Sequence, residues 1–300
     1  MSGHWRKNTE RQNETHNRAE ELASSLPPLL IAAERVASIV YQGIHGRRRV
    51  GQGETFWQFR RYEYGDSVQL IDWRQSAKSD PVYVRDTEWE AAQSIWLWRD
   101  GSPSMYFRSK PNFEIKRKRA DLLVLALSSL LIRAGEQVAL LGTAMAPAAD
   151  RAVFNRMWTM IEGDPSCCSS LPKTELLPRY ARIVMVGDFL SPIEELGEMI
   201  KSFANRGIRG HLVQVLDPAE ERLPYDGRVL FDGPEAEGQV FIPHVGSLRD
   251  AYMKELANHR NKIDDLCRRF DWSFLSHRTD QPPERVLLRL YLQLSEMVIP

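Results

Sequence analysis

The chain has 300 residues, 43% of them hydrophobic and 9% aromatic, which is enough to bury a core and excludes a disordered protein. Its 40 Lys and Arg residues balance its 40 Asp and Glu residues, and zero net charge argues against a chain that binds nucleic acid by neutralising phosphates. The three cysteines, Cys167, Cys168 and Cys267, fit neither a disulfide framework nor a spaced zinc site, so they favour a reducing compartment.

The N-terminal segment, residues 1–25, is polar and charged and predicts a disordered tail. It lacks the apolar central stretch of a cleaved signal peptide. No run in the sequence approaches the roughly 18 apolar residues that a membrane-spanning helix needs. We therefore expect a cytoplasmic protein without a membrane span.

Three regions follow the tail. Residues 26–45 place Leu30, Ala33 and Val36 at helical spacing, which predicts an amphipathic helix. Residues 46–92 mix glycine, aromatic and charged residues without a helical period, which predicts a small β-rich subdomain. Residues 93–300 should form one large domain.

The large domain alternates strands with helices. Strands are predicted at 94–98, 137–142, 182–186, 211–216 and 272–276, helices at 116–134, 151–161, 191–206, 247–270 and 284–297, and an edge hairpin at 228–232 and 239–243. The clearest helix start is Ser191, an N-cap residue followed by Pro192 and Glu194. This alternation predicts an α/β fold with a doubly wound, mostly parallel sheet and Rossmann-type layering, whose ligands bind at the carboxyl ends of the strands.

Acids and serines follow two of the predicted strands. Asp100, Ser102 and Ser104 come directly after the strand at 94–98, and Asp188 comes after the strand at 182–186. One carboxylate and two hydroxyls at alternate positions can curl around a small hard cation, because Mg²⁺ prefers oxygen ligands. If the sheet order makes these two strands neighbours, their ends lie close together, and the sequence then predicts a shared metal site at this edge of the sheet.

This motif resembles the metal-ion-dependent adhesion site of von Willebrand factor A domains, Asp-x-Ser-x-Ser followed by a distant Thr and a distant Asp. Asp100, Ser102 and Ser104 match the first element and Asp188 matches the last, whereas Thr143 comes earlier than the pattern expects. In that family an acidic side chain of the ligand completes the metal shell. The resemblance therefore implies a von Willebrand factor A-like domain that docks a protein partner through Mg²⁺ or another divalent cation.

A second resemblance lies upstream. The segments Arg61–Asp66, Ile71–Trp73 and Ser76–Lys78 are similar to the signature of family fifty-eight of the bacterial domains of unknown function, in which this signature precedes a von Willebrand A-like segment. The likeness extends from about residue 51 to about residue 280. Members of that family are commonly encoded beside MoxR-type AAA+ ATPases, so the resemblance implies such an ATPase and its client as partners.

Two basic features bear on the metal prediction. Arg99 precedes Asp100 at a position that is usually apolar in the adhesion motif. One alternative is that Arg99 forms an ion pair with Asp100 in place of the metal. The cluster Lys116–Arg119 opens a helix, where positive charge opposes the helix dipole. We expect that cluster to be a solvated face.

The sequence contains no Gly-x-x-x-x-Gly-Lys-Ser/Thr loop, no His-Glu-x-x-His and no Gly-x-Ser-x-Gly, which disfavours nucleotide, zinc and serine hydrolases. We expect a non-enzymatic adaptor that captures an acidic residue of the ATPase or its client. Two alternatives stay open. One is a Mg²⁺-dependent hydrolase that uses Asp100 and Asp188 around a metal-bound water, and the other is a metal-free interaction scaffold.

Overall fold

The computed structural model describes residues 28–45, 56–61, 73–76, 83–87, 94–163, 169–178, 181–235 and 238–296. The chain divides into two compact units, Gly43–Ala92 and the remainder. In the smaller unit β1 (Phe56–Arg61) pairs antiparallel with β2 (Tyr83–Thr87), and α3 (Trp73–Ser76) lies between them in sequence. The tail, most of the upstream signature, Cys167 and Cys168 lie outside the described residues.

The larger unit is built on a five-stranded sheet in the order β4-β3-β5-β6-β9. Every neighbouring pair in this sheet is parallel, which confirms the predicted α/β fold with a parallel central sheet. The strands are β3 (Ser94–Arg99), β4 (Gln137–Leu140), β5 (Arg182–Gly187), β6 (Arg209–Leu216) and β9 (Ser273–Arg278).

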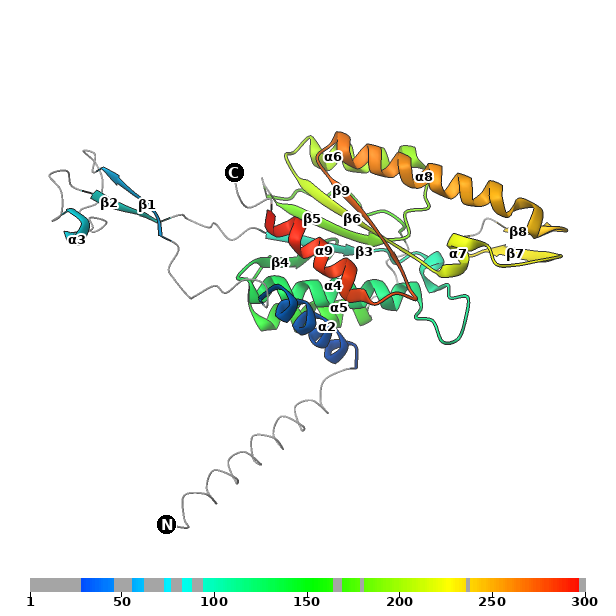
Figure 1. Cartoon of the computed structure of the whole chain (residues 1–300), viewed down its shortest axis with the longest axis horizontal. Helices are drawn as coiled ribbons and strands as arrows, with labels where there is room; N and C mark the ends of the chain where they lie inside the picture. The colour runs from blue at the N-terminus through cyan, green and yellow to red at the C-terminus, as the bar shows by residue number, and fades with distance from the viewer. Residues whose placement is uncertain are drawn as a thin grey trace, which may run out of the picture. The chain divides into compact units, whose positions relative to one another are not determined.

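Helices cover both faces of this sheet (Figure 1). The helices α4 (Lys116–Arg133), α5 (Arg151–Gly163) and α9 (Pro283–Glu296) cover one face, and α6 (Ile193–Ala204) and α8 (Arg249–Arg269) cover the other. The N-terminal helix α2 (Pro28–His45) is tied to α4 by an ion pair between Glu34 and Arg133. Of the described helices, none has both the length and the apolar character needed to cross a membrane.

The strand order reverses direction at β3. From β3 the chain crosses to β4 on one side and then returns to β5 on the other side. The two crossovers therefore leave the sheet in opposite directions, and the carboxyl ends of β3 and β5 border a topological switch point, where open α/β sheets bind their ligands. The Asp100 loop and Asp188 follow these two strands.

Three details differ from the sequence-based expectations. Helix α6 begins at Ile193 with Pro192 at its N-cap and no side-chain cap, so Ser191 does not cap it. The short helix α7 (Pro218–Arg222) was not expected, since its 5 residues are too few to show a period. The strands β7 (Val229–Gly233) and β8 (Gly238–Ile242) form a separate antiparallel sheet rather than an edge of the main sheet.

Candidate functional site

The loop after β3 joins four of the five predicted metal ligands, Asp100, Ser102, Ser104 and Asp188, in one hydrogen-bonded network. The Ser102 amide donates to Asp100 Oδ1 at 2.8 Å, and the hydroxyls of Ser102 and Ser104 lie 2.9 Å apart. The Ser104 hydroxyl then donates to Asp188 Oδ2 at 2.6 Å. Strands β3 and β5 thus bring together residues that are 84 positions apart in the sequence.

Gly187 allows these strand ends to approach. The Asp100 amide donates to the Val186 carbonyl at 2.8 Å, so the β3–β5 pairing continues into the loop. A Cβ atom on Gly187 would lie 2.8 Å from the Asp100 Cβ and 3.0 Å from its Oδ2. Any larger residue at 187 would therefore displace the Asp100 carboxylate.

Asp100 is fully buried, at 0% exposure, and only partly satisfied. Within the described part of the chain, its Oδ2 has no hydrogen-bond partner. Burial, followed by the charge of Asp188, raises the pKa of Asp100 to about 7. A buried acceptor without a partner is energetically costly, so this oxygen is a place where a cation or a proton would be stabilised.

Thr143 does not join the network. Its hydroxyl donates to the Leu140 carbonyl at 2.7 Å, where it satisfies the end of its own strand β4. Thr143 therefore stays outside the network that connects Asp100, Ser102, Ser104 and Asp188.

Arg99 does not pair with Asp100. Its Nε lies 2.8 Å from Asp121 Oδ1, and its Nη2 donates to the Ile161 carbonyl at 3.1 Å. Successive side chains of a strand point to opposite faces, so Arg99 points toward α4 and α5 whereas Asp100 points toward Gly187. The alternative in which Arg99 replaces the metal is wrong.

Lys116 is the cation of this site. The expectation of a solvated face was wrong for this residue, because its side chain is 0% exposed. Its Nζ lies 3.0 Å from Asp188 Oδ2 and 2.6 Å from Glu220 Oε1. Burial lowers the pKa of Lys116, but the two carboxylates more than compensate, so the pKa lies above its usual value and the ammonium stays charged.

Glu220 comes from a third strand end, which the sequence analysis missed. Asp217 follows β6 and accepts the Ala219 amide at 2.8 Å, while Glu220 Oε2 accepts the Asp217 amide at 2.7 Å. This capping box starts α7 and leaves Glu220 Oε1 for Lys116. The signal was present in the sequence as Asp217-Pro218-Ala219-Glu220, an acid and a glutamate at capping-box spacing after a predicted strand.

The backbone after Asp188 is strained. Phe189 is buried and has a φ of 49°, in the left-handed region that aromatic residues rarely adopt. Its carbonyl lies 2.8 Å from His259 Nε2, and the Asp188 carbonyl accepts from Gln214 Nε2 at 2.8 Å. These contacts from β6 and α8 hold the Asp188 loop in place, and such strain is typical of functional sites.

Three apolar residues near the network have exposed side chains. Tyr106 and Phe107 come two and three residues after Ser104, and Leu190 donates its amide to Asp188 Oδ1 at 3.4 Å. We call Tyr106, Phe107 and Leu190 the apolar rim.

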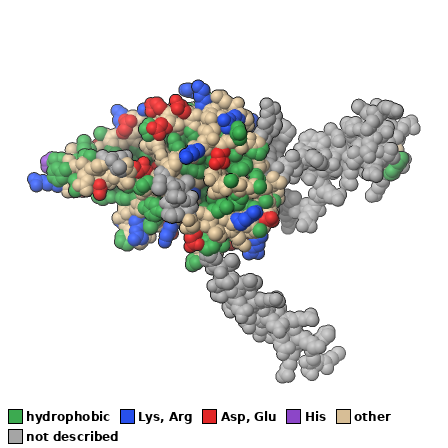
Figure 2. Space-filling view, turned by 180° about the vertical axis from the view of Figure 1, so that it is seen from behind, with side chains coloured by type: hydrophobic (Ala, Val, Ile, Leu, Met, Phe, Trp, Pro, Cys, Tyr) green, Lys and Arg blue, Asp and Glu red, His purple; other side chains and the backbone are tan. Residues whose placement is uncertain are grey.

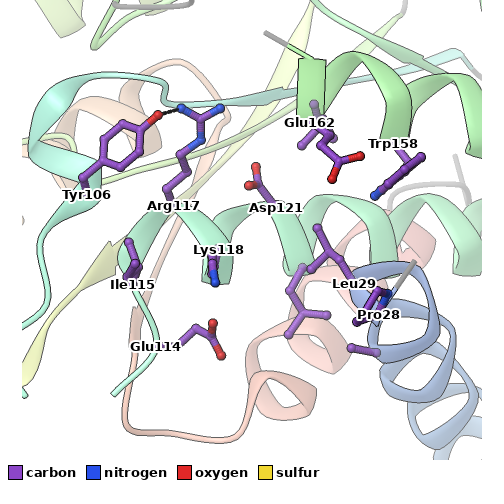
Figure 3. Close-up of a pocket in the computed structure, with 13 residues that line it drawn as sticks. Pro28, Leu29, Tyr106, Glu114, Ile115, Arg117, Lys118, Asp121, Trp158 and Glu162 are labelled. Atoms are coloured by element: carbon purple, nitrogen blue, oxygen red, sulfur yellow. Dashed lines mark hydrogen bonds between the residues drawn. The ribbon is translucent and has the colours of Figure 1, made fainter. Parts of the chain in front are cut away.

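A groove of about 620 Å³ lies between α2, α4 and α5 (Figure 3). Tyr106 stands at one side of it, and the Arg117 guanidinium lies 4.9 Å from the centre of the Tyr106 ring. Asp121, the partner of Arg99, also lines the groove. The groove therefore adjoins the network without containing its carboxylates.

The sequence matches a known protein family over most of its length. The pattern of the family described as "Protein of unknown function DUF58" matches residues 58–262. The uncharacterized proteins Rv1480 of Mycobacterium tuberculosis and Mb1516 of Mycobacterium bovis are each 26% identical over 278 residues, which covers 87% of this chain and 86% of each relative.

Two solved structures are also similar. The conserved hypothetical protein BatB from Bacteroides thetaiotaomicron aligns with a TM-score of 0.40 and 14% identity, covering 68% of this chain and 99% of that one. An aerotolerance-related membrane protein from Bacteroides fragilis aligns with a TM-score of 0.40 and 15% identity over the same shares.

Proposed function

This chain belongs to the DUF58 family, and we propose that it is a non-enzymatic interaction protein with a von Willebrand factor A-like domain. Its docking site is the network at the carboxyl ends of β3 and β5. In this proposal a divalent cation such as Mg²⁺ is held by Asp100, Ser102 and Ser104, with Asp188 orienting the shell, as the resemblance to the adhesion motif implies.

This proposal rests on the buried Oδ2 of Asp100, which has no hydrogen-bond partner among the residues that the structure describes. A metal ion at this oxygen would satisfy it, and the serine hydroxyls nearby are ligands of the kind that hard cations accept. No three His, Cys, Asp or Glu side chains of the described residues gather around one point, so hydroxyls and water would supply the remaining ligands. When bound, the metal would supply a fixed positive charge for an incoming carboxylate.

The apolar rim supports a protein as the ligand. Exposed aromatic and aliphatic residues beside a polar centre are typical of protein interfaces, whose cores are enriched in aromatic side chains. The proposed partner therefore offers an acidic side chain within an apolar surface. By family resemblance, we propose a MoxR-type AAA+ ATPase or its client as that partner.

Titration calorimetry with Mn²⁺ and Mg²⁺ tests the site directly. We expect the wild type to bind, and Asp100→Asn and Ser104→Ala to lose about tenfold or more in affinity, because each removes a ligand oxygen. Ser128→Ala is the matched control, since Ser128 is also buried but donates only to its own helix, to the Val124 carbonyl at 2.8 Å. A wild type that binds neither metal would refute the metal-dependent site and leave a metal-free scaffold.

Partner recovery gives the functional readout. Affinity purification should yield a partner in Mg²⁺ that is lost in EDTA and with Asp100→Asn, but kept with Ser128→Ala. Recovery that is the same under all four conditions would contradict metal-dependent docking.

One observation favours a second function, Mg²⁺-dependent hydrolysis. A carboxylate whose pKa is raised to about 7, like that of Asp100, is matched to general-base catalysis near neutral pH. Turnover of phosphate or carboxylate esters by the wild type, abolished in Asp100→Asn, would replace the docking proposal. Docking is preferred because the exposed apolar rim beside the network fits the surface of a protein partner.

A further inference from the structure

We propose that Lys116 couples metal binding to the capture of an acidic partner group. Its ammonium neutralises Asp188 and Glu220 in the metal-free site and weakens the binding of a divalent cation alone. It then leaves the metal-loaded site without the net negative charge that would repel the partner's carboxylate. This inference rests on the proposed function, because it concerns the same network.

The geometry places Lys116 inside the network but away from its surface. Its Nζ contacts Asp188 Oδ2, the same oxygen that accepts the Ser104 hydroxyl at 2.6 Å. The ammonium is therefore one hydrogen bond from the serine ligands. Since the side chain is 0% exposed, Lys116 does not itself contact a partner and acts through its charge.

Charge counting shows what the lysine changes. The directly connected groups are three carboxylates, Asp100, Asp188 and Glu220, and one ammonium, which leaves two net negative charges. A divalent cation brings this total to zero, so the loaded site does not repel an incoming carboxylate. Without Lys116 the loaded site would keep one net negative charge and repel it. Asp217 stands outside this set, because both of its oxygens accept backbone amides, from Ala219 and Ser109.

The position of Lys116 is unfavourable for a purely structural role. It is the first residue of α4, where the helix dipole disfavours positive charge, and the helix has no side-chain cap there. A buried ion pair can often be replaced by apolar residues without loss of stability. A charge kept at such a cost is more readily explained by the electrostatics of the site than by packing.

Mn²⁺ calorimetry on charge variants tests the coupling. Lys116→Met removes the repelling ammonium and should bind Mn²⁺ about tenfold or more tightly, since unit charges a few ångströms apart interact strongly at a partly buried site. Glu220→Gln keeps the cap of α7 but removes one of the two negative charges beside the Lys116 ammonium. This variant should therefore bind Mn²⁺ several-fold more weakly. The double variant should lie between the two single variants. A Lys116→Met variant with wild-type affinity, or a double variant as tight as Lys116→Met, would overturn the inference.

An acidic probe tests the second half of the coupling. A labelled poly-glutamate peptide should bind the wild type with Mn²⁺ but not with EDTA, and Lys116→Met should lose about tenfold of that affinity although it holds the metal more tightly. Equal peptide binding by both proteins would overturn the inference while leaving the docking site intact. Absence of Mn²⁺ binding in every variant would instead refute the proposed function.

Folding does not block this test. Lys116→Met leaves Asp188 and Glu220 without their counter-charge, so the melting temperature of each variant is measured with and without Mn²⁺. Because a ligand raises the melting temperature according to its affinity, a destabilised variant still reports metal binding. Should Lys116→Met not fold, Glu220→Gln carries the test, and its unchanged Mn²⁺ affinity would refute the coupling.

Discussion

At the scale of single residues, Gly187 controls how closely the two acids approach. Gly187→Ala would place a Cβ atom 2.8 Å from the Asp100 Cβ, and both atoms belong to well-packed strand ends. We expect a loss of about 1–3 kcal/mol in unfolding free energy, together with weakened Mn²⁺ binding. Urea denaturation and calorimetry measure the two effects.

Gly197→Ala is the matched control for that change. Gly197 lies within α6, and its added Cβ would meet Leu266 at 3.7 Å, an ordinary contact. Alanine in a helix interior should raise stability by about 0.5–1 kcal/mol and leave metal binding unchanged. Equal effects of the two substitutions would show that the Gly187 contact has no special role.

Two buried histidines predict a pH dependence. Burial, followed by a nearby arginine in each case, lowers the pKa values of His211 and His277 to about 4. Between the unfolded pKa, about 6.5, and about 4, the unfolded chain binds more protons than the folded chain, so stability falls as the pH is lowered through this window. His211→Gln should remove up to about 3 kcal/mol of that loss.

Comparison with the wild type isolates this effect. The pKa values of Asp100 and Asp121, raised mainly by burial to about 7 and about 6, act in the opposite direction, because they make the folded state bind more protons below those values. The test is therefore the difference in unfolding free energy between His211→Gln and the wild type at pH 7.5 and pH 5. A difference that does not change with pH would contradict the prediction.

The residues of the site show what the sequence could and could not predict. Strand-end placement, a local feature, put Asp100 and Asp188 at the same edge of the sheet, but their proximity also depends on β3 and β5 being neighbours in the sheet order. The role of Lys116 depends on Glu220, which is 104 positions away, and no local pattern contains that pairing. Arg99 was assigned wrongly because strand alternation, which turns it away from Asp100, was not applied to it.

At the scale of elements, strands were easier to predict than short helices and caps. Four of the five strands of the sheet, β3, β4, β5 and β6, are mostly buried, so their positions follow largely from composition, whereas β9 is only half-buried. Pro192 rather than Ser191 occupies the N-cap of α6, so a sequence match to a capping pattern did not fix the boundary.

The hairpin β7–β8 exposes apolar side chains. Leu230, Val240 and Phe241 are 56%, 57% and 59% exposed, and hydrophobic side chains reach the surface at this end of the molecule (Figure 2). Val240→Thr should change the unfolding free energy by no more than about 0.5 kcal/mol. Val213→Thr, the same change in the buried strand β6, should cost about 1–3 kcal/mol because its hydroxyl is buried. Similar losses in urea denaturation would show that the hairpin is covered in solution.

At the scale of the whole molecule, the fold class could be predicted from the alternation of strands and helices. The division of the chain into two units did not show what the upstream signature does. The parallel sheet needs crossovers of strand and helix, and these are visible along residues 93–300. The upstream signature lies mostly outside the described residues, so its role stays a prediction. What the sheet supplies is a switch point at which three strand ends, those of β3, β5 and β6, contribute acids to one network.

The buried Asp100 carboxylate of this network favours metal binding but lowers the stability of the metal-free fold. Asp100→Asn removes a buried charge whose Oδ2 has no hydrogen-bond partner among the described residues, so in EDTA at pH 8 we expect the variant to be more stable than the wild type by about 1–2 kcal/mol. The gain should shrink at pH 5, because Asp100, with its pKa raised to about 7, is then already protonated in the folded wild type. With saturating Mn²⁺ the order should reverse, since only the wild type gains the free energy of metal binding. Urea denaturation under the three conditions measures this, and a variant less stable than the wild type in EDTA at pH 8 would show that the Asp100 carboxylate is satisfied in the resting fold.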